Sequence, residues 1–128
     1  MVVRKLLQPM GTADLDGWIR GYRAAWESND PVAIGALFAE DAVYYTEPAA
    51  EPWHSRAEIV AQWLARRDEP GDATFEWTPL VNTPGLAVIT GRTVYRSGDD
   101  YDNLWVIRFD DDGLCCEFTE WWMRRSAG

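Results

Sequence analysis

Histidine and cysteine are scarce in this sequence. Its 128 residues include one histidine and two cysteines, Cys115 and Cys116, which are adjacent. Neighbours on a strand point to opposite faces, so a disulfide between these two is geometrically poor, and a reducing, cytoplasmic compartment is expected. One histidine is too few for a Cys/His zinc set at the usual spacings. We therefore expect no metal, and no motif in the sequence indicates a cofactor.

Positive charge and long apolar runs are also scarce. Twelve Lys and Arg stand against twenty-one Asp and Glu, which gives a net charge of −9. Such a surface repels nucleic acids and anionic membranes. No apolar run approaches the roughly 20 residues that a membrane span requires. We expect neither partner.

Tryptophan, in contrast, is abundant. Eight tryptophans and 47% hydrophobic residues indicate a globular chain, and 128 residues suit a single domain spanning 1–128. Residues 1–12 have too short an apolar segment for a signal peptide, so we expect a loosely held, flexible arm. Rings this numerous either fill a core or line a cavity that accepts a small apolar molecule.

Apolar spacing and capping residues predict three helices. A stripe at i, i+3, i+4, i+7 and i+11 predicts the first, from Asp14, its candidate N-cap, to Ser28. Asp30-Pro31 can cap and start a short second helix, which forms a hairpin with the first. Ser55-Arg56-Ala57-Glu58 is a capping box for a third helix, which ends at about Arg67.

β-Branched and aromatic residues predict five strands. Strands of about ten residues are too long to stay flat over a small core, so we expect the sheet to curve, with Gly91 as a bulge or kink. Short turns between the last four strands predict an antiparallel meander. The order is ααβαββββ, an α+β fold. The five expected strands are Asp41–Glu47, Ala73–Asn82, Leu86–Arg96, Tyr101–Asp110 and Leu114–Arg124.

Four segments carry a resemblance to a known family. They are Phe38-Ala39-Glu40-Asp41-Ala42, the segment from Trp53 to Ile59, the segment from Arg108 to Gly113, and Glu120-Trp121-Trp122. With the element order, they resemble the nuclear transport factor 2-like superfamily, and most of all its small bacterial SnoaL-like proteins. The resemblance implies a cystatin-like cone: a strongly curved, mostly antiparallel sheet wrapped around the N-terminal helices, with a pocket inside.

Within that superfamily, the chain is distantly similar to ketosteroid isomerases. Tyr22 matches the tyrosine of the first helix that donates to the substrate oxyanion. The general-base position falls on Thr46, with Glu47 one residue away, and the second oxyanion acid falls on Trp105. With two of three catalytic positions changed, the resemblance does not imply steroid-type isomerisation unless Glu47 turns inward.

Strand alternation then indicates the pocket wall. If Thr46 and Trp105 face inward, alternate residues of the same and neighbouring strands do so too, including Cys116 and Glu120. A carboxyl among aromatic rings loses solvation, which raises its pKa and suits it to acid and base work. Alternatively, a bulge places Glu120 on the outer face, paired with Arg92 or Arg108.

The candidate catalytic residues are therefore Glu120 as acid and base, with Tyr22 and Asn103 to orient a ligand. An alternative of equal weight is that Tyr22 is one more aromatic ring of the core. His54 and Glu47 are secondary candidates, because His54 more often fixes a loop and Glu47 more often ends a strand in solvent. Trp63 sits on a helical stripe, where a ring is more often core. The candidate substrate-binding residues are Tyr44, Thr46, Trp63, Trp105, Ile107, Phe118 and Trp122.

Two functions remain open. One is a cofactor-independent isomerase, cyclase, hydratase or hydrolase that transfers protons on an apolar carbonyl-containing or polycyclic compound. The other is a non-catalytic ligand-binding or assembly module, which predicts a small or absent cavity and no strongly perturbed carboxyl. An outer sheet face carrying Trp121, with Tyr95 beside it, predicts a homodimer.

Overall fold

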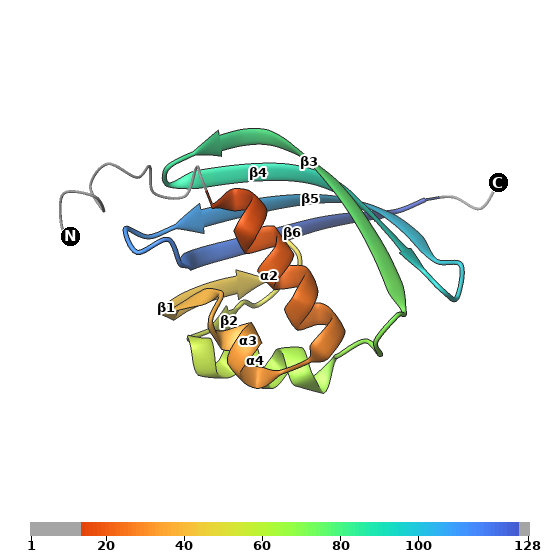
Figure 1. Cartoon of the computed structure of the whole chain (residues 1–128), viewed down its shortest axis with the longest axis horizontal. Helices are drawn as coiled ribbons and strands as arrows, with labels where there is room; N and C mark the ends of the chain where they lie inside the picture. The colour runs from red at the N-terminus through yellow and green to blue at the C-terminus, as the bar shows by residue number, and fades with distance from the viewer. Residues whose placement is uncertain (1–13, 126–128) are drawn as a thin grey trace.

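The computed structural model describes residues 14–125, in which three helices pack against one curved sheet of six strands (Figure 1). This α+β architecture is the predicted class, and the expected arm at residues 1–12 lies outside the described residues. The helices are α2 (Leu15–Ser28), α3 (Pro31–Gly35) and α4 (Arg56–Ala65), and the strands are β1 (Phe38–Tyr45), β2 (Trp53–His54), β3 (Ala73–Thr83), β4 (Leu86–Tyr95), β5 (Asp100–Phe109) and β6 (Cys115–Arg124).

The strands lie in the order β2-β1-β6-β5-β4-β3. All neighbours are antiparallel except β1 and β6, which are parallel. The predicted meander from β3 to β6 is confirmed. The prediction missed β2, since two residues are too few to show an alternation, and it began β1 at Asp41 instead of Phe38.

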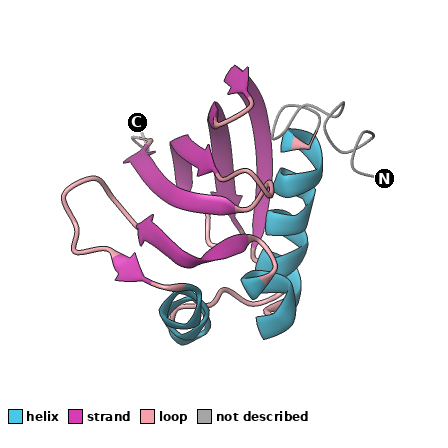
Figure 2. Ribbon diagram, turned by 90° about the vertical axis from the view of Figure 1, so that its left-hand side faces the viewer, coloured by secondary structure: helices cyan, strands magenta, loops and turns pink. Residues whose placement is uncertain are grey.

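The sheet curls so strongly that α2 runs along its concave side (Figure 2). Register shifts in the pairings of β1 with β6, β3 with β4 and β5 with β6 accompany the bend. The expected bulge at Gly91 is wrong, because this residue pairs regularly with Trp77 and Asn103. A glycine stands there for another reason: a Cβ would lie 2.6 Å from Cε1 of the Phe75 ring, which covers it.

Local capping explains where two of the helices begin. Asp30 accepts a hydrogen bond from the Val32 backbone N–H at 3.1 Å, and Ser55 accepts one from that of Glu58 at 3.2 Å. Both caps were predicted. Asp14 is at the N-cap of α2, but its side chain makes no capping bond, so the prediction was right in position and wrong in mechanism.

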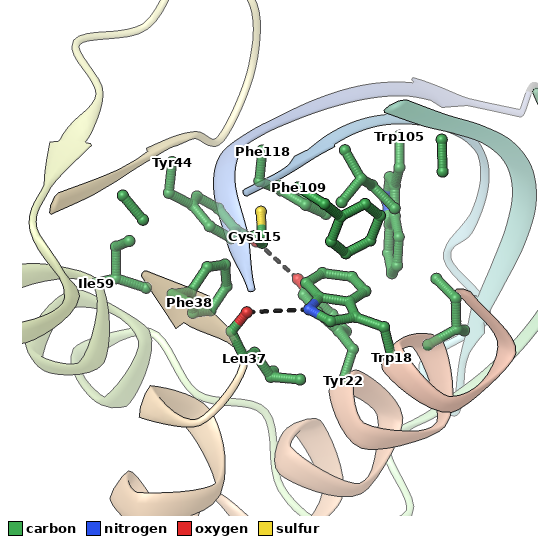
Figure 3. Packing of buried hydrophobic residues seen from close by; sticks show 14 of the residues in the cluster. Trp18, Tyr22, Leu37, Phe38, Tyr44, Ile59, Trp105, Phe109, Cys115 and Phe118 are labelled. Carbon is green, nitrogen blue, oxygen red and sulfur yellow. Dashed lines mark hydrogen bonds between the residues drawn. The ribbon is translucent and has the colours of Figure 1, made fainter. Parts of the chain in front are cut away.

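The core between α2 and the sheet combines aliphatic side chains with a cluster of aromatic rings (Figure 3). The Trp18 ring contacts those of Phe38, Phe109 and Phe118, and its indole N–H donates to the Leu37 carbonyl at 3.0 Å. Burying a side chain of this size contributes about 1.5–3 kcal/mol. The stripe of α2 is thus fixed against the sheet. No helix within residues 14–125 is long and apolar enough to cross a membrane.

Candidate functional site

A cavity of about 540 Å³ opens on the concave side of the sheet, between α2, α4 and the ends of β4 to β6. Its size suits a small organic molecule, for which sites are roughly 300–1,000 Å³. Aromatic rings make up much of its wall, and a few polar groups interrupt them. The lining residues are Tyr22, Trp26, Tyr44, Trp53, Trp63, Arg66, Arg67, Asp68, Thr93, Tyr95, Ser97, Asp99, Tyr101, Asn103, Trp105, Glu120 and Trp122.

Glu120 is the carboxyl that β6 contributes to this wall. Its Oε2 accepts two hydrogen bonds, from the Asn103 amide at 2.7 Å and from the Trp105 indole N–H at 3.1 Å. Within residues 14–125, no hydrogen bond reaches Oε1. One oxygen therefore anchors the carboxyl, and the other is left for a ligand. The alternative pairing fails, because Arg92 binds Asp100 and Arg108 lies against Glu117.

Burial among these rings raises the pKa of Glu120 from 4.5 to about 7. Desolvation disfavours the charged carboxylate and outweighs the two hydrogen bonds, which act in the opposite direction. At neutral pH both protonation states are populated. The group can therefore accept a proton and return it without a large change in free energy.

Asn103 is itself held in one orientation. The Thr93 hydroxyl donates to its Oδ1 at 2.8 Å, which directs the amide N–H groups toward Glu120. Both residues are buried. Thr93 was missed by sequence reasoning. The sequence did indicate it, because Thr93 is a polar residue on the same face of β4 as the buried Ala87 and Ile89.

Tyr22 and Tyr44 bring two hydroxyl groups to the same cavity. The hydroxyls share a hydrogen bond of 2.7 Å, so one of the two O–H groups donates to the other and the second remains available. Burial raises the pKa of both phenols well above its usual value, so both stay neutral. The Tyr44 ring stacks on Trp53 and Phe118, which fixes its position. Sequence reasoning assigned Tyr44 to the wall and missed this pairing.

Comparison with known proteins agrees with the architecture. The family model of the SnoaL-like domain matches residues 19–118, which is most of the chain. The chain belongs to this family. Tyr22 and Asn103 lie inside the matched segment and Glu120 lies two residues beyond it. Among curated proteins, none matches the chain.

Solved structures show the same fold for this SnoaL-like domain. An NTF2-like protein of unknown function from Mesorhizobium loti is 21% identical, with a TM-score of 0.68 over 88% of this chain and 93% of that one. An NTF-2 like protein of unknown function from Burkholderia xenovorans LB400 is 15% identical, with a TM-score of 0.73 over 93% and 90%. A protein with a cystatin-like fold from Methylobium petroleophilum PM1 is 16% identical, with a TM-score of 0.71 over 94% and 82%. At such identities the likeness concerns the fold alone.

A second carboxyl of the SnoaL-like domain lines the cavity on the side of α2 and α4. Asp68 accepts hydrogen bonds at Oδ2 from the Trp26 indole N–H at 2.8 Å and from the Tyr95 hydroxyl at 3.4 Å. Tyr95 thus faces the cavity, and the expectation that it lies beside Trp121 on the outer face is wrong. It continues the inward alternation of β4 from Thr93.

The predicted wall residues divide into two groups. Trp63, Trp105 and Trp122 line the cavity together with Tyr44. Ile107 and Phe118 do not line it, because both are fully buried in the core.

Two other sequence predictions differ from the structure. Thr46 does not line the cavity, because β1 ends at Tyr45 and the chain leaves the sheet. Cys116 does not face inward, because the register shift between β5 and β6 turns Cys115 into the core instead.

Glu47 and His54 are exposed and lie outside the cavity wall. The backbone N–H of His54 donates to the Glu58 carboxylate, which ties the loop to α4. Among residues 14–125, no three potential metal ligands gather in one place.

Proposed function

We propose that this SnoaL-like domain is a cofactor-independent enzyme that moves a proton on a small, largely apolar carbonyl compound. Glu120 is the acid and base, Tyr22 orients the carbonyl group of the substrate, and Asn103 orients the Glu120 carboxyl. The observation that carries the proposal is the anchored carboxyl in the cavity wall, with Oε2 held by two donors and Oε1 unbonded within residues 14–125. Its pKa of about 7 supports the same role.

In this reaction, ionised Glu120 takes a proton from the carbon next to a carbonyl group. The C–H bond breaks, its electron pair forms the carbon–carbon double bond of an enolate, and the negative charge moves to the carbonyl oxygen. The available O–H of the Tyr22–Tyr44 pair donates to that oxygen, since a neutral phenol in a dry site stabilises developing charge. Protonated Glu120 then returns the proton to carbon.

The non-catalytic module makes a different prediction, namely a small or absent cavity and no strongly perturbed carboxyl. The cavity of about 540 Å³ and the raised pKa of Glu120 both favour the enzyme.

Deuterium exchange on a simple ketone tests the proposal without knowledge of the natural substrate. 2-Tetralone in D₂O exchanges its acidic C–H protons, and ¹H NMR follows the loss of their signal. We expect the protein to accelerate exchange, with a rate that rises with pH around 7 as Glu120 ionises.

Glu120→Gln should lose this acceleration. Glu117→Gln is the matched control, because Glu117 lies on the same strand, faces Arg108 and does not line the cavity. Equal rates for wild type and Glu120→Gln, or no acceleration at all, would contradict the proposal.

A homodimer through the outer sheet face and a cytoplasmic location complete the proposal. Trp121 and Met123, alternate residues of β6, are 46% and 48% exposed, which is a high exposure for such large apolar side chains. Cys115 and Cys116 are free thiols, as a reducing compartment permits. Sedimentation velocity should show a dimer that Trp121→Glu dissociates; a monomeric wild type would contradict the association.

A further inference from the structure

Within residues 14–125, most arginines have a carboxylate partner, and two of the three exceptions line the cavity. Within residues 14–125, Arg56, Arg66 and Arg67 are the arginines without an ion pair. Arg56 donates to the Phe38 carbonyl. Arg66 and Arg67 both line the cavity. The arginines with ion pairs are Arg20, Arg23, Arg92, Arg96, Arg108, Arg124 and Arg125.

The two cavity arginines keep most of their hydrogen-bonding capacity. The Arg66 guanidinium carbon lies over the Trp53 ring, 5.6 Å from its centroid, and within residues 14–125 the Arg66 guanidinium donates no hydrogen bond. Arg67 donates one N–H to the Leu64 carbonyl at 3.3 Å. A guanidinium has five N–H donors in a fork that fits a carboxylate. Neither side chain is therefore saturated.

The carboxyls on the same side of the cavity cancel this positive charge only in part. Asp99 is paired with Arg124 at 2.6 Å. Asp68 is occupied by the Trp26 and Tyr95 donors. Two arginines against Asp68 leave one positive charge at this side of the cavity, which matches a monoanion better than a dianionic phosphate.

We infer that the substrate carries a carboxylate that Arg66 and Arg67 bind, while its apolar, carbonyl-bearing body extends among the aromatic rings toward Glu120. The substrate class is then a keto acid with an aromatic or polycyclic body. This inference rests on the proposed function, since it assigns the substrate of the same cavity.

A pair of probes that differ only in charge tests it. Naphthalene-2-carboxylate and 2-naphthamide have the same ring system, and isothermal titration calorimetry at pH 6 gives the Kd of each. At that pH the carboxylate probe is ionised and Glu120 is mostly protonated. We expect the wild type to bind the carboxylate about tenfold more tightly than the amide, with a preference that falls as salt is added.

The Arg66→Gln/Arg67→Gln double variant should bind the two probes equally. Arg20→Gln/Arg108→Gln is the matched control, because it removes the same two charges from exposed ion pairs with Asp16 and Glu117 outside the cavity. It should keep the preference. Circular dichroism verifies that each variant is folded.

A wild type without preference, or a preference that survives in the double variant, would overturn the inference. In both cases amide binding would still agree with a cavity for aromatic compounds, and 2-tetralone exchange would decide the proposed function separately. Tighter binding of 2-naphthyl phosphate than of the carboxylate would overturn the assignment of a monoanion. Failure of both naphthalene probes to bind at millimolar concentration would also overturn the inference.

Discussion

The pH dependence of folding stability reports directly on the burial of Glu120. Folding raises the pKa of this carboxyl from 4.5 to about 7, so the folded protein holds the proton more tightly than the unfolded chain does. Between these pH values, deprotonation therefore favours unfolding. A shift of this size corresponds to about 3 kcal/mol. Relative to Glu120→Gln, which does not titrate, the wild type should keep a constant stability below pH 4.5. It should lose about 3 kcal/mol between pH 4.5 and 7, and nothing further above that.

Urea unfolding between pH 4 and 8.5, followed by tryptophan fluorescence, measures this difference. Other carboxyls, such as Asp72 and Asp100, have a pKa lowered by hydrogen bonds to Arg96 and Arg92, but they titrate in both proteins and cancel in the comparison. Glu117→Gln keeps Glu120 and should therefore show the same loss relative to Glu120→Gln, because Glu117 lies outside the cavity. Parallel curves for wild type and Glu120→Gln, or a wild type that gains relative stability as the pH rises, would refute the burial argument.

Two further substitutions test the packing around the cavity by the same urea assay. Gly91→Ala should lower the free energy of unfolding by about 1–3 kcal/mol, because its Cβ would lie 2.6 Å from the Phe75 ring. Gly85→Ala, whose Cβ would lie 4.0 Å from the Phe109 carbonyl oxygen, should change the free energy of unfolding little; equal effects would contradict the assigned clash. Tyr22→Phe should cost about 1–3 kcal/mol, because the buried Tyr44 hydroxyl loses its partner, and an unchanged stability would exclude that hydrogen bond.

Local patterns predicted the parts of the fold that local physics determines. The stripe of α2, the caps at Asp30 and Ser55, and the turns of the meander all act within a few residues, and the structure confirms them. The parallel pairing of β1 with β6 joins segments about 75 residues apart and leaves no local pattern, so it was missed. The close approach of Phe75 to Gly91 is also long-range, and the glycine alone suggested a bulge.

The candidate site divides in a similar way. Alternation along single strands placed Tyr44, Asn103 and Glu120 on the cavity side, where the structure has them. Arg66 and Arg67 follow the end of α4 and reach the cavity only through the packing of that helix beneath the sheet. No periodicity in the sequence signals such a contribution. The Thr46 prediction failed for a related reason, since strand parity has no meaning after the strand ends.

The environment of Glu120 follows from the register of β5 against β6. Pairing sets Trp105 opposite Glu120 and Asn103 opposite Trp122, so the two donors to Oε2 are inward residues of one neighbouring strand, two positions apart. The register shift in this ladder lies near Cys115, before Phe118, and the pairing after it is regular. A slip of one residue beyond that shift would turn Glu120 to the outer face and Trp121 into the cavity. The same ladder that folds the sheet therefore determines whether the cavity contains a carboxyl at all.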